Sequence, residues 1–170
     1  MSGQIAESIA KARSALASKL EAGPGQDRPA SAVVEDGLRC RVEGGDGWAI
    51  VTDMPQAVGG TGAAPTPGWL MRAAWASCAA TAIAMRAAEL GISLTRLDVT
   101  AESESDMRGL LAVGDGVPPG PQSARLRVRI AADDADERRL RELVEWADRH
   151  SPVGDALRRA VPIELDVTGR

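Results

Sequence analysis

The stretch TPGWLMRAAWASCAATAIAMRAAELG, residues 66–91, decides the fold. It is nearly apolar all round, which predicts a long buried helix over residues 66–90. Thr66 is a plausible N-cap residue, Pro67 suits the first helical position, and Gly91 suits the position just after the helix end. Because most of its side chains are small alanines, a second helix could approach this one closely.

Two shorter segments precede this helix. Residues 4–21 have the apolar spacing of an amphipathic helix that ends at Gly23-Pro24-Gly25. Residues 33–42 alternate in polarity and predict one strand, and a turn at 44–47 leads to a returning strand over 48–53. We therefore expect an N-terminal helical extension and linker over 1–25, followed by a single domain over 30–170.

The part after the long helix combines strands and helices. The expected elements are strands over 94–104, 125–130 and 161–167, a loop over 106–123, a helix over 134–150 and a short helix over 155–160. Asp134 and Glu137 have the spacing of a capping box, and Pro152 ends the helix. Acidic residues on 94–104 and arginines on 125–130 are expected to face each other on neighbouring strands. This order favours an α+β fold over a doubly wound sheet.

Composition excludes several classes of protein. The chain has 170 residues and a net charge of −4, with no basic tract, so a nucleic-acid partner is disfavoured. The longest uncharged apolar run, residues 73–85, is shorter than the roughly 20 residues of a membrane-spanning helix. One histidine (His150) and two cysteines offer few metal ligands, so we expect no metal and no cofactor. No signal peptide is visible, and the expected location is the cytoplasm.

The candidate reactive residue is Cys78, in the middle of the long helix. At helical spacing its face holds the residues Met71, Ala74, Trp75, Thr81, Ala82 and Met85. In one interpretation Cys78 is a small buried hydrophobic residue. In the other it is a nucleophilic thiolate in an apolar pocket, which needs a cation or hydrogen-bond donor near the sulfur.

A series of motifs resembles the OsmC/Ohr family. These are GGTGAAPTP (59–67), ASCAAT (76–81), GISLTRLDV (91–99), DMRGLL (106–111) and SPVGDAL (151–157). The resemblance covers residues 33–167. It implies antiparallel sheets around a long buried central helix, an intertwined homodimer with the two long helices at its centre, and thiol-dependent reduction of organic hydroperoxides. Cys78 stands where the family keeps its peroxidatic cysteine.

The sequence departs from the family pattern at three places. Ser151 stands where the family has its second, resolving cysteine. Gly68 replaces a glutamate, and the turn at 44–47 lacks an arginine. Because that arginine and glutamate would activate the thiolate, only an inward-turned Arg39 or Arg41 could substitute for the missing cation.

Other residues carry weaker expectations. Trp69, Trp75, Thr81 and Met85 are possible pocket-lining residues, and the two tryptophans are otherwise core. Cys40 is expected to pack in the core, although it could replace the lost resolving thiol if it reached Cys78.

Three functions follow as alternatives. The first is a thiol peroxidase in which Cys78 reduces a small organic hydroperoxide and an external thiol regenerates it. The second is a family member without catalysis that binds a small apolar or acyl ligand. The third is a redox sensor with one thiol, which would be oxidised reversibly without turnover.

Overall fold

The structure, a computed structural model, describes residues 2–169 and divides into two units. One unit contains residues 74–169 and the first turns of helix α1 (Ser2–Ala17), and the other contains residues 11–73. The division falls inside α1 and inside helix α2 (Pro67–Glu89). Helix α1 is followed by a short 3-10 helix, η1 (Leu20–Ala22), and buries none of its residues. Among the described residues, no helix is long and apolar enough to cross a bilayer.

The unit of residues 11–73 contains a three-stranded antiparallel sheet in the order β1-β2-β3. Its strands are β1 (Ala30–Asp36), β2 (Arg39–Gly44) and β3 (Ala49–Thr52). The prediction of one strand over 33–42 is wrong, because the chain turns at Gly37 and makes a hairpin there. Gly37 has φ +54, which glycine adopts without a steric penalty. The Asp-Gly pair at 36–37 is the hairpin signal that the alternating pattern obscured.

The loop between β3 and α2 is organised around Asp53. This side chain is 1% exposed and accepts hydrogen bonds from the backbone N–H groups of Met54, Thr61 and Ala63. The hydroxyl of Thr61 donates to the same carboxylate at 2.5 Å. This last bond is the main reason that the pKa of Asp53 falls to about 2, and the backbone donors add to it against the opposing effect of burial. The carboxylate therefore fixes the loop that leads into α2. The same loop contains the short 3-10 helix η2 (Gln56–Val58).

Helix α2 begins and ends as the sequence predicts. Thr66 Oγ1 accepts a hydrogen bond from the backbone N–H of Trp69, and Pro67 is the first residue of the helix. At the other end Gly91 has φ +68, and the N–H of Ile92 donates to the carbonyl of Ala87. Along one face Trp75, Ala79, Ile83 and Ala87 are buried, in steps of four residues, and the opposite face is exposed within this single chain.

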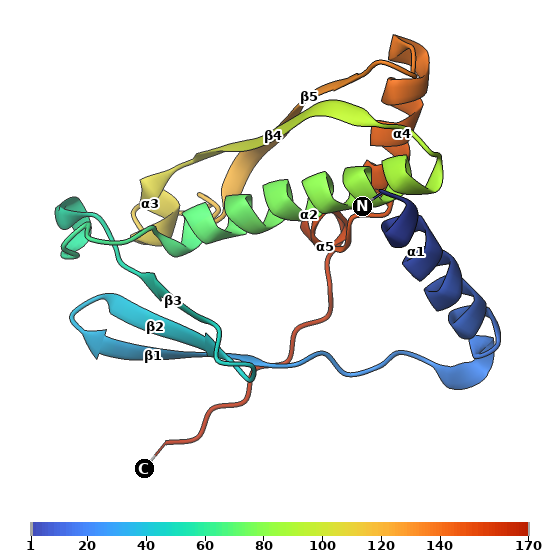
Figure 1. The fold of residues 1–170 in the computed structure, drawn as a ribbon. Helices are drawn as coiled ribbons and strands as arrows, with labels where there is room; N and C mark the ends of the chain where they lie inside the picture. Colours follow the sequence, from blue (N-terminus) through green and yellow to red (C-terminus); the bar gives the residue numbers. More distant parts are fainter. Residues whose placement is uncertain (1, 170) are drawn as a thin grey trace. The chain divides into compact units, whose positions relative to one another are not determined.

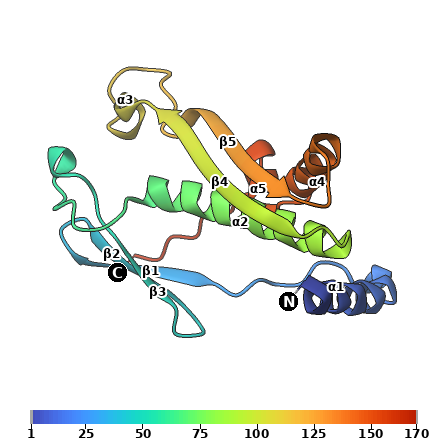
Figure 2. The same ribbon diagram turned by 45° about the horizontal axis from the view of Figure 1, so that its top comes forward.

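A two-stranded antiparallel ribbon lies along α2 (Figures 1 and 2). It consists of β4 (Leu94–Ser105) and β5 (Pro121–Ala132), joined by a segment that contains the short helix α3 (Met107–Leu110). The expected opposition of acidic and basic residues is confirmed. Asp98 lies opposite Arg129, and Arg127 Nε donates to Glu102 Oε2 at 2.9 Å. Both side chains of this ion pair are about half exposed, so it aligns the strands more than it stabilises them.

The main core joins α2, the ribbon and helix α4 (Glu137–Arg149). Its buried members are Ile83, Ala87, Ile92, Leu140, Leu143 and Ala147. Apolar residues of β4 and β5 such as Leu97 and Ile130 pack against them. The amphipathic pattern over 134–150 therefore identified the buried stripe of α4 correctly, although the N-cap is Asp136. Asp134 instead accepts from the backbone N–H of Ser93, so the predicted capping box is wrong.

The last part of the chain differs from the prediction. Helix α5 spans Pro152–Arg158, so Pro152 both ends α4 and begins α5. Residues 159–169 have no regular secondary structure, and the predicted strand over 161–167 does not form within this chain. Its alternating apolar side chains Ile163, Leu165 and Val167 are more than 80% exposed. A strand needs a neighbouring strand to satisfy its backbone, and none of the described strands pairs with this segment.

Candidate functional site

Cys78 and Ser151 lie in contact, although they are 73 residues apart in the sequence. The hydroxyl of Ser151 donates a hydrogen bond to Cys78 Sγ at 3.2 Å. Cys78 is a free, partly buried thiol, and Ser151 is completely buried. The structure therefore brings together the two residues that the resemblance singled out.

The local structure fixes Ser151 in this place. Ser151 is the N-cap residue of α5, and its Oγ accepts a hydrogen bond from the backbone N–H of Gly154 at 3.2 Å. A Cβ atom on Gly154 would lie 3.2 Å from both Ser151 Oγ and Ser151 Cβ, a tight contact, so this close packing favours a residue without a side chain. The Ser151 hydroxyl thus donates to Cys78 Sγ and accepts from the Gly154 N–H, and these two hydrogen bonds set its orientation.

This arrangement can support a nucleophilic thiolate but cannot close a disulfide. A hydroxyl that donates to sulfur stabilises negative charge on it, and the thiolate is the reactive form of cysteine. Serine has no sulfur, so oxidised Cys78 cannot be resolved by residue 151.

A cavity of about 440 Å³ is lined by two neighbours of the Cys78–Ser151 pair, Trp75 and Gly154, and not by the pair itself. Apolar side chains of β5 and α4 line it, namely Leu126, Val128 and Val144, together with Trp75 of α2 and Gly154 of α5. Trp75 precedes Cys78 by three residues on α2, and Gly154 contacts Ser151. The cavity is therefore lined by neighbours of the pair on two helices, α2 and α5.

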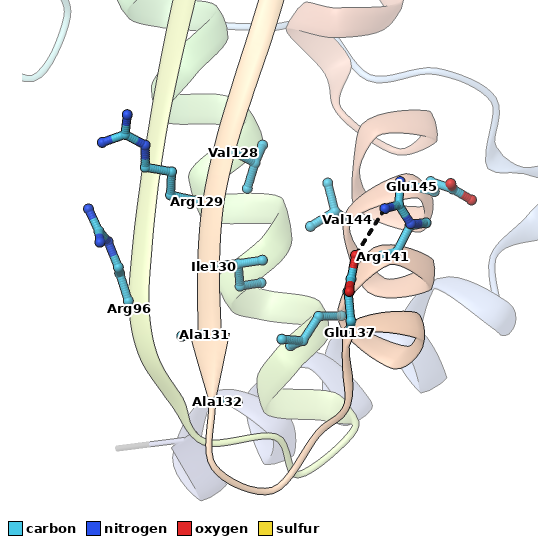
Figure 3. A pocket seen from close by; sticks show the side chains of 11 residues that line it. Arg96, Val128, Arg129, Ile130, Ala131, Ala132, Glu137, Arg141, Val144 and Glu145 are labelled. Atoms are coloured by element: carbon cyan, nitrogen blue, oxygen red, sulfur yellow. Dashed lines mark hydrogen bonds and ion pairs between the residues drawn. The ribbon is translucent and has the colours of Figure 1, made fainter.

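A second cavity, of about 750 Å³, continues from the first along β5 and α4 (Figure 3). Both cavities share Val128, Val144 and Glu145. In Figure 3, Val128 and Ile130 point from β5 toward α4, and Arg96 and Arg129 extend to the other side of the ribbon. The two cavities are therefore neighbours along β5 and α4, and charged as well as apolar side chains line both of them.

The comparison with protein families decides the assignment. The family model of OsmC-like proteins matches residues 60–166, which is more than half of the chain and includes both Cys78 and Ser151. The chain belongs to the OsmC/Ohr family.

Solved structures of OsmC-like proteins have the same fold. An organic hydroperoxide resistance protein OsmC of Legionella pneumophila is 25% identical with a TM-score of 0.57, over 80% of this chain and 92% of that chain. A Vibrio cholerae protein assigned to organic hydroperoxide resistance, with captopril bound in one of its active sites, is 26% identical with a TM-score of 0.54, over 79% and 87%. An OsmC-like protein of Mycoplasma pneumoniae has a TM-score of 0.67 at 16% identity, over 79% and 89%. A search of the curated proteins finds no significant match.

The two arginines that could substitute for the missing cation make other contacts in this OsmC-like protein. Arg39 pairs with Glu35 at 3.5 Å, and Arg41 pairs with Glu43 at 2.6 Å. The hydrogen bond that Arg41 donates to the Glu43 carboxylate raises the pKa of Arg41. Both guanidinium groups are more than 40% exposed and held by these carboxylates on the small sheet. A solvated strand face therefore explains them.

The expected pocket residues differ in their surroundings. Trp75 is 7% exposed and lines the cavity of about 440 Å³. Thr81 and Met85 lie on the exposed side of α2, and Trp69 is half exposed near the start of that helix. Cys40 is partly buried in β2, opposite Thr52 in β3. Of these four expected pocket residues, Trp75 alone lines one of the cavities formed by the described residues.

Sequence reasoning missed one cluster at the far end of α2. The guanidinium of Arg86 lies 4.4 Å from the ring centre of Trp146. The His150 ring stacks on the indole of Trp146, with 3.9 Å between the ring centres. Arg86 also pairs with Glu89 at 3.4 Å. The spacing of Trp146 and His150 by four residues on α4 was the available signal. These contacts attach α4 to α2 and give His150 a packing role.

Proposed function

We propose that this OsmC-like protein reduces small organic hydroperoxides with the thiolate of Cys78, in a cycle that uses one cysteine. The hydrogen bond from Ser151 to Cys78 Sγ is the observation that carries the proposal, because it offers the sulfur a donor. Relatives assigned to organic hydroperoxide resistance share the fold. Cys78 is the proposed catalytic residue, and Ser151 is a positioning residue.

The cycle has three steps with balanced atoms. The Cys78 thiolate attacks the terminal oxygen of ROOH, the O–O bond breaks, and RO⁻ takes a proton to leave as the alcohol ROH, while the cysteine becomes a sulfenic acid. An external thiol R′SH attacks the sulfenic sulfur and water leaves, which gives a mixed disulfide. A second R′SH releases the Cys78 thiol and forms R′SSR′. A reducing cytoplasmic compartment would supply such thiols.

The chain also favours assembly into a homodimer, and we propose the intertwined form described above. The outer face of α2 exposes Ala74, Ser77, Thr81, Ala84 and Met85. The four small side chains of this row are suited to close helix packing, and Met85 and the exposed apolar residues of the C-terminal tail are further surface for a second copy to cover. In this assembly α2 would become a buried central helix.

The main alternative is a ligand-binding protein without turnover. Ser151 in place of a cysteine removes the disulfide step, and the cavity lined by Trp75 remains. The two functions differ in whether Cys78 is oxidised by a hydroperoxide. Addition of one equivalent of cumene hydroperoxide, followed by a sulfenic-acid trap and intact mass measurement, is expected to label the Cys40→Ser variant and not the Cys78→Ser variant. An unlabelled Cys40→Ser protein would leave ligand binding as the function. Labelling without turnover would indicate a redox sensor.

A further inference from the structure

An ion pair closes the corner between α4 and α5. Arg158 Nη2, in the last turn of α5, donates to both oxygens of the Asp148 carboxylate, in the last turn of α4, at 2.7 Å each. The segment between these two residues contains Ser151, the N-cap residue of α5. The ion pair therefore spans the turn that carries the hydrogen-bond donor of Cys78.

Arg158 also contacts the backbone that holds Ser151. The carbonyl oxygen of Asp148 accepts a hydrogen bond of 3.4 Å from Arg158 Nη1 and another of 3.4 Å from the backbone N–H of Ser151. A Cβ atom on Gly154 would lie 3.0 Å from the same Nη1 and 3.2 Å from Ser151 Oγ. The guanidinium and the hydroxyl therefore pack against the same glycine, where a side chain would crowd both of them.

A similar ion pair lies next to this one and does not cross the corner. Arg159 Nε donates to Asp155 Oδ2 at 2.5 Å, and this contact joins residues four apart at the end of α5. Both pairs are about half exposed, so each one adds little to the stability of the fold. A difference between their effects on Cys78 therefore reports the closure of the corner and not the presence of a surface charge.

We propose that Arg158 is a positioning residue for the thiol, and that it keeps Ser151 Oγ on Cys78 Sγ by closing the α4–α5 corner through Asp148. The proposal rests on the function proposed above and names a residue that tunes its nucleophile. A hydrogen bond weakens steeply when its distance and angle depart from their best values. Opening of the corner therefore deprives the thiolate of its donor, which is completely buried in the closed form.

The test is the pH dependence of the alkylation of Cys78 by iodoacetamide, because the thiolate is the reacting form. It uses the full chain with Cys40→Ser, so that one thiol reports. Ser151→Ala removes the donor and is expected to raise the midpoint of the rate–pH profile by about one pH unit. Arg158→Gln is expected to raise it by about half a unit. The matched control Arg159→Gln is expected to leave it unchanged.

Asp148→Asn separates positioning from a direct effect of charge. Loss of a carboxylate near a thiolate would by itself lower the alkylation midpoint, and loss of a guanidinium would raise it. Positioning predicts a rise for Asp148→Asn and for Arg158→Gln, because both substitutions break the same ion pair. In a Ser151→Ala background neither is expected to add to the shift, since the residue through which they act is gone.

Two results would overturn the proposal in favour of direct electrostatics, namely a lower alkylation midpoint in Asp148→Asn or a further rise when Arg158→Gln is added to Ser151→Ala. A reduced melting temperature with an unmoved alkylation profile would assign the ion pair a structural role alone, and would overturn the proposal as well. The readout does not involve peroxide. Shifted profiles without peroxide turnover would therefore refute the enzymatic function alone, and turnover with unshifted profiles would refute this inference alone.

Discussion

Ser151 Oγ lies 3.2 Å from Cys78 Sγ and donates a hydrogen bond to it. A residue that only capped α5 would not need this second contact. Because the two side chains already touch, a sulfur at position 151 is expected to restore a two-cysteine cycle.

The variant Ser151→Cys, made in a Cys40→Ser background, is expected to form a disulfide with Cys78 after one equivalent of cumene hydroperoxide. Both remaining thiols should disappear, and the protein mass should fall by two hydrogens. The Cys40→Ser protein alone should lose one thiol and gain one oxygen. A Ser151→Cys protein that keeps one thiol after oxidation would show that the two sulfurs cannot reach bonding geometry.

Gly154 tests how tightly the pair is packed. Alanine in place of glycine in a helix usually stabilises it, but a Cβ here would lie 3.0 Å from Arg158 Nη1 and 3.2 Å from the completely buried Ser151. Gly154→Ala is therefore expected to cost about 1 kcal/mol or more of unfolding free energy and to change the rate at which Cys78 reacts with an alkylating agent. Gly68→Ala is the matched control, since its Cβ would meet nothing closer than 3.9 Å. A neutral effect of Gly154→Ala would contradict the close packing at Ser151.

Asp53 predicts a pH dependence of stability. Its folded-state pKa of about 2 lies below the ordinary value of 3.8, so its contribution is fully present above pH 3.8 and is lost as the pH falls toward 2. Asp53→Asn is expected to lower the thermal midpoint by several degrees at pH 7, with the difference from the original protein shrinking between pH 4 and pH 2. A difference that stays constant over this range would mean that ionised Asp53 does not stabilise the loop.

The outer face of α2 predicts where a second copy binds. Ala84 is exposed within one chain, so Ala84→Glu should leave the isolated fold unchanged but should break a dimer that packs through α2. Light scattering is expected to give a dimer for the original protein and for the control Ala156→Glu, an exposed alanine of α5, and a monomer for Ala84→Glu. A dimer in all three proteins would place the interface elsewhere.

How much the sequence predicted depended on where the determining contacts lie. Helix α2 was predicted well because its signals are local: Thr66 caps it, Pro67 opens it and Gly91 closes it. The split of 33–42 into two strands was missed because alternation hides a turn at Gly37. The strand over 161–167 was expected from alternation, which reports side-chain polarity and not the presence of a neighbouring strand.

The candidate site shows the same division. Cys78 was a candidate from the sequence itself, but Ser151 could be singled out only through family resemblance, since nothing in the spacing of residues 73 positions apart indicates a contact. The ion pair of Asp148 and Arg158 was missed for a related reason, because it forms only across the corner between α4 and α5, whose geometry no local pattern encodes.

The central claim is that Cys78 turns over organic hydroperoxides without a second cysteine. The most direct measurement is the consumption of cumene hydroperoxide with dithiothreitol as the external thiol, comparing the original protein, Cys40→Ser and Cys78→Ala. We predict turnover by the first two proteins, and a rate for Cys78→Ala equal to that of the mixture without protein. Equal consumption by the original protein and Cys78→Ala would contradict the claim and would leave the cavity beside Trp75 as a binding site.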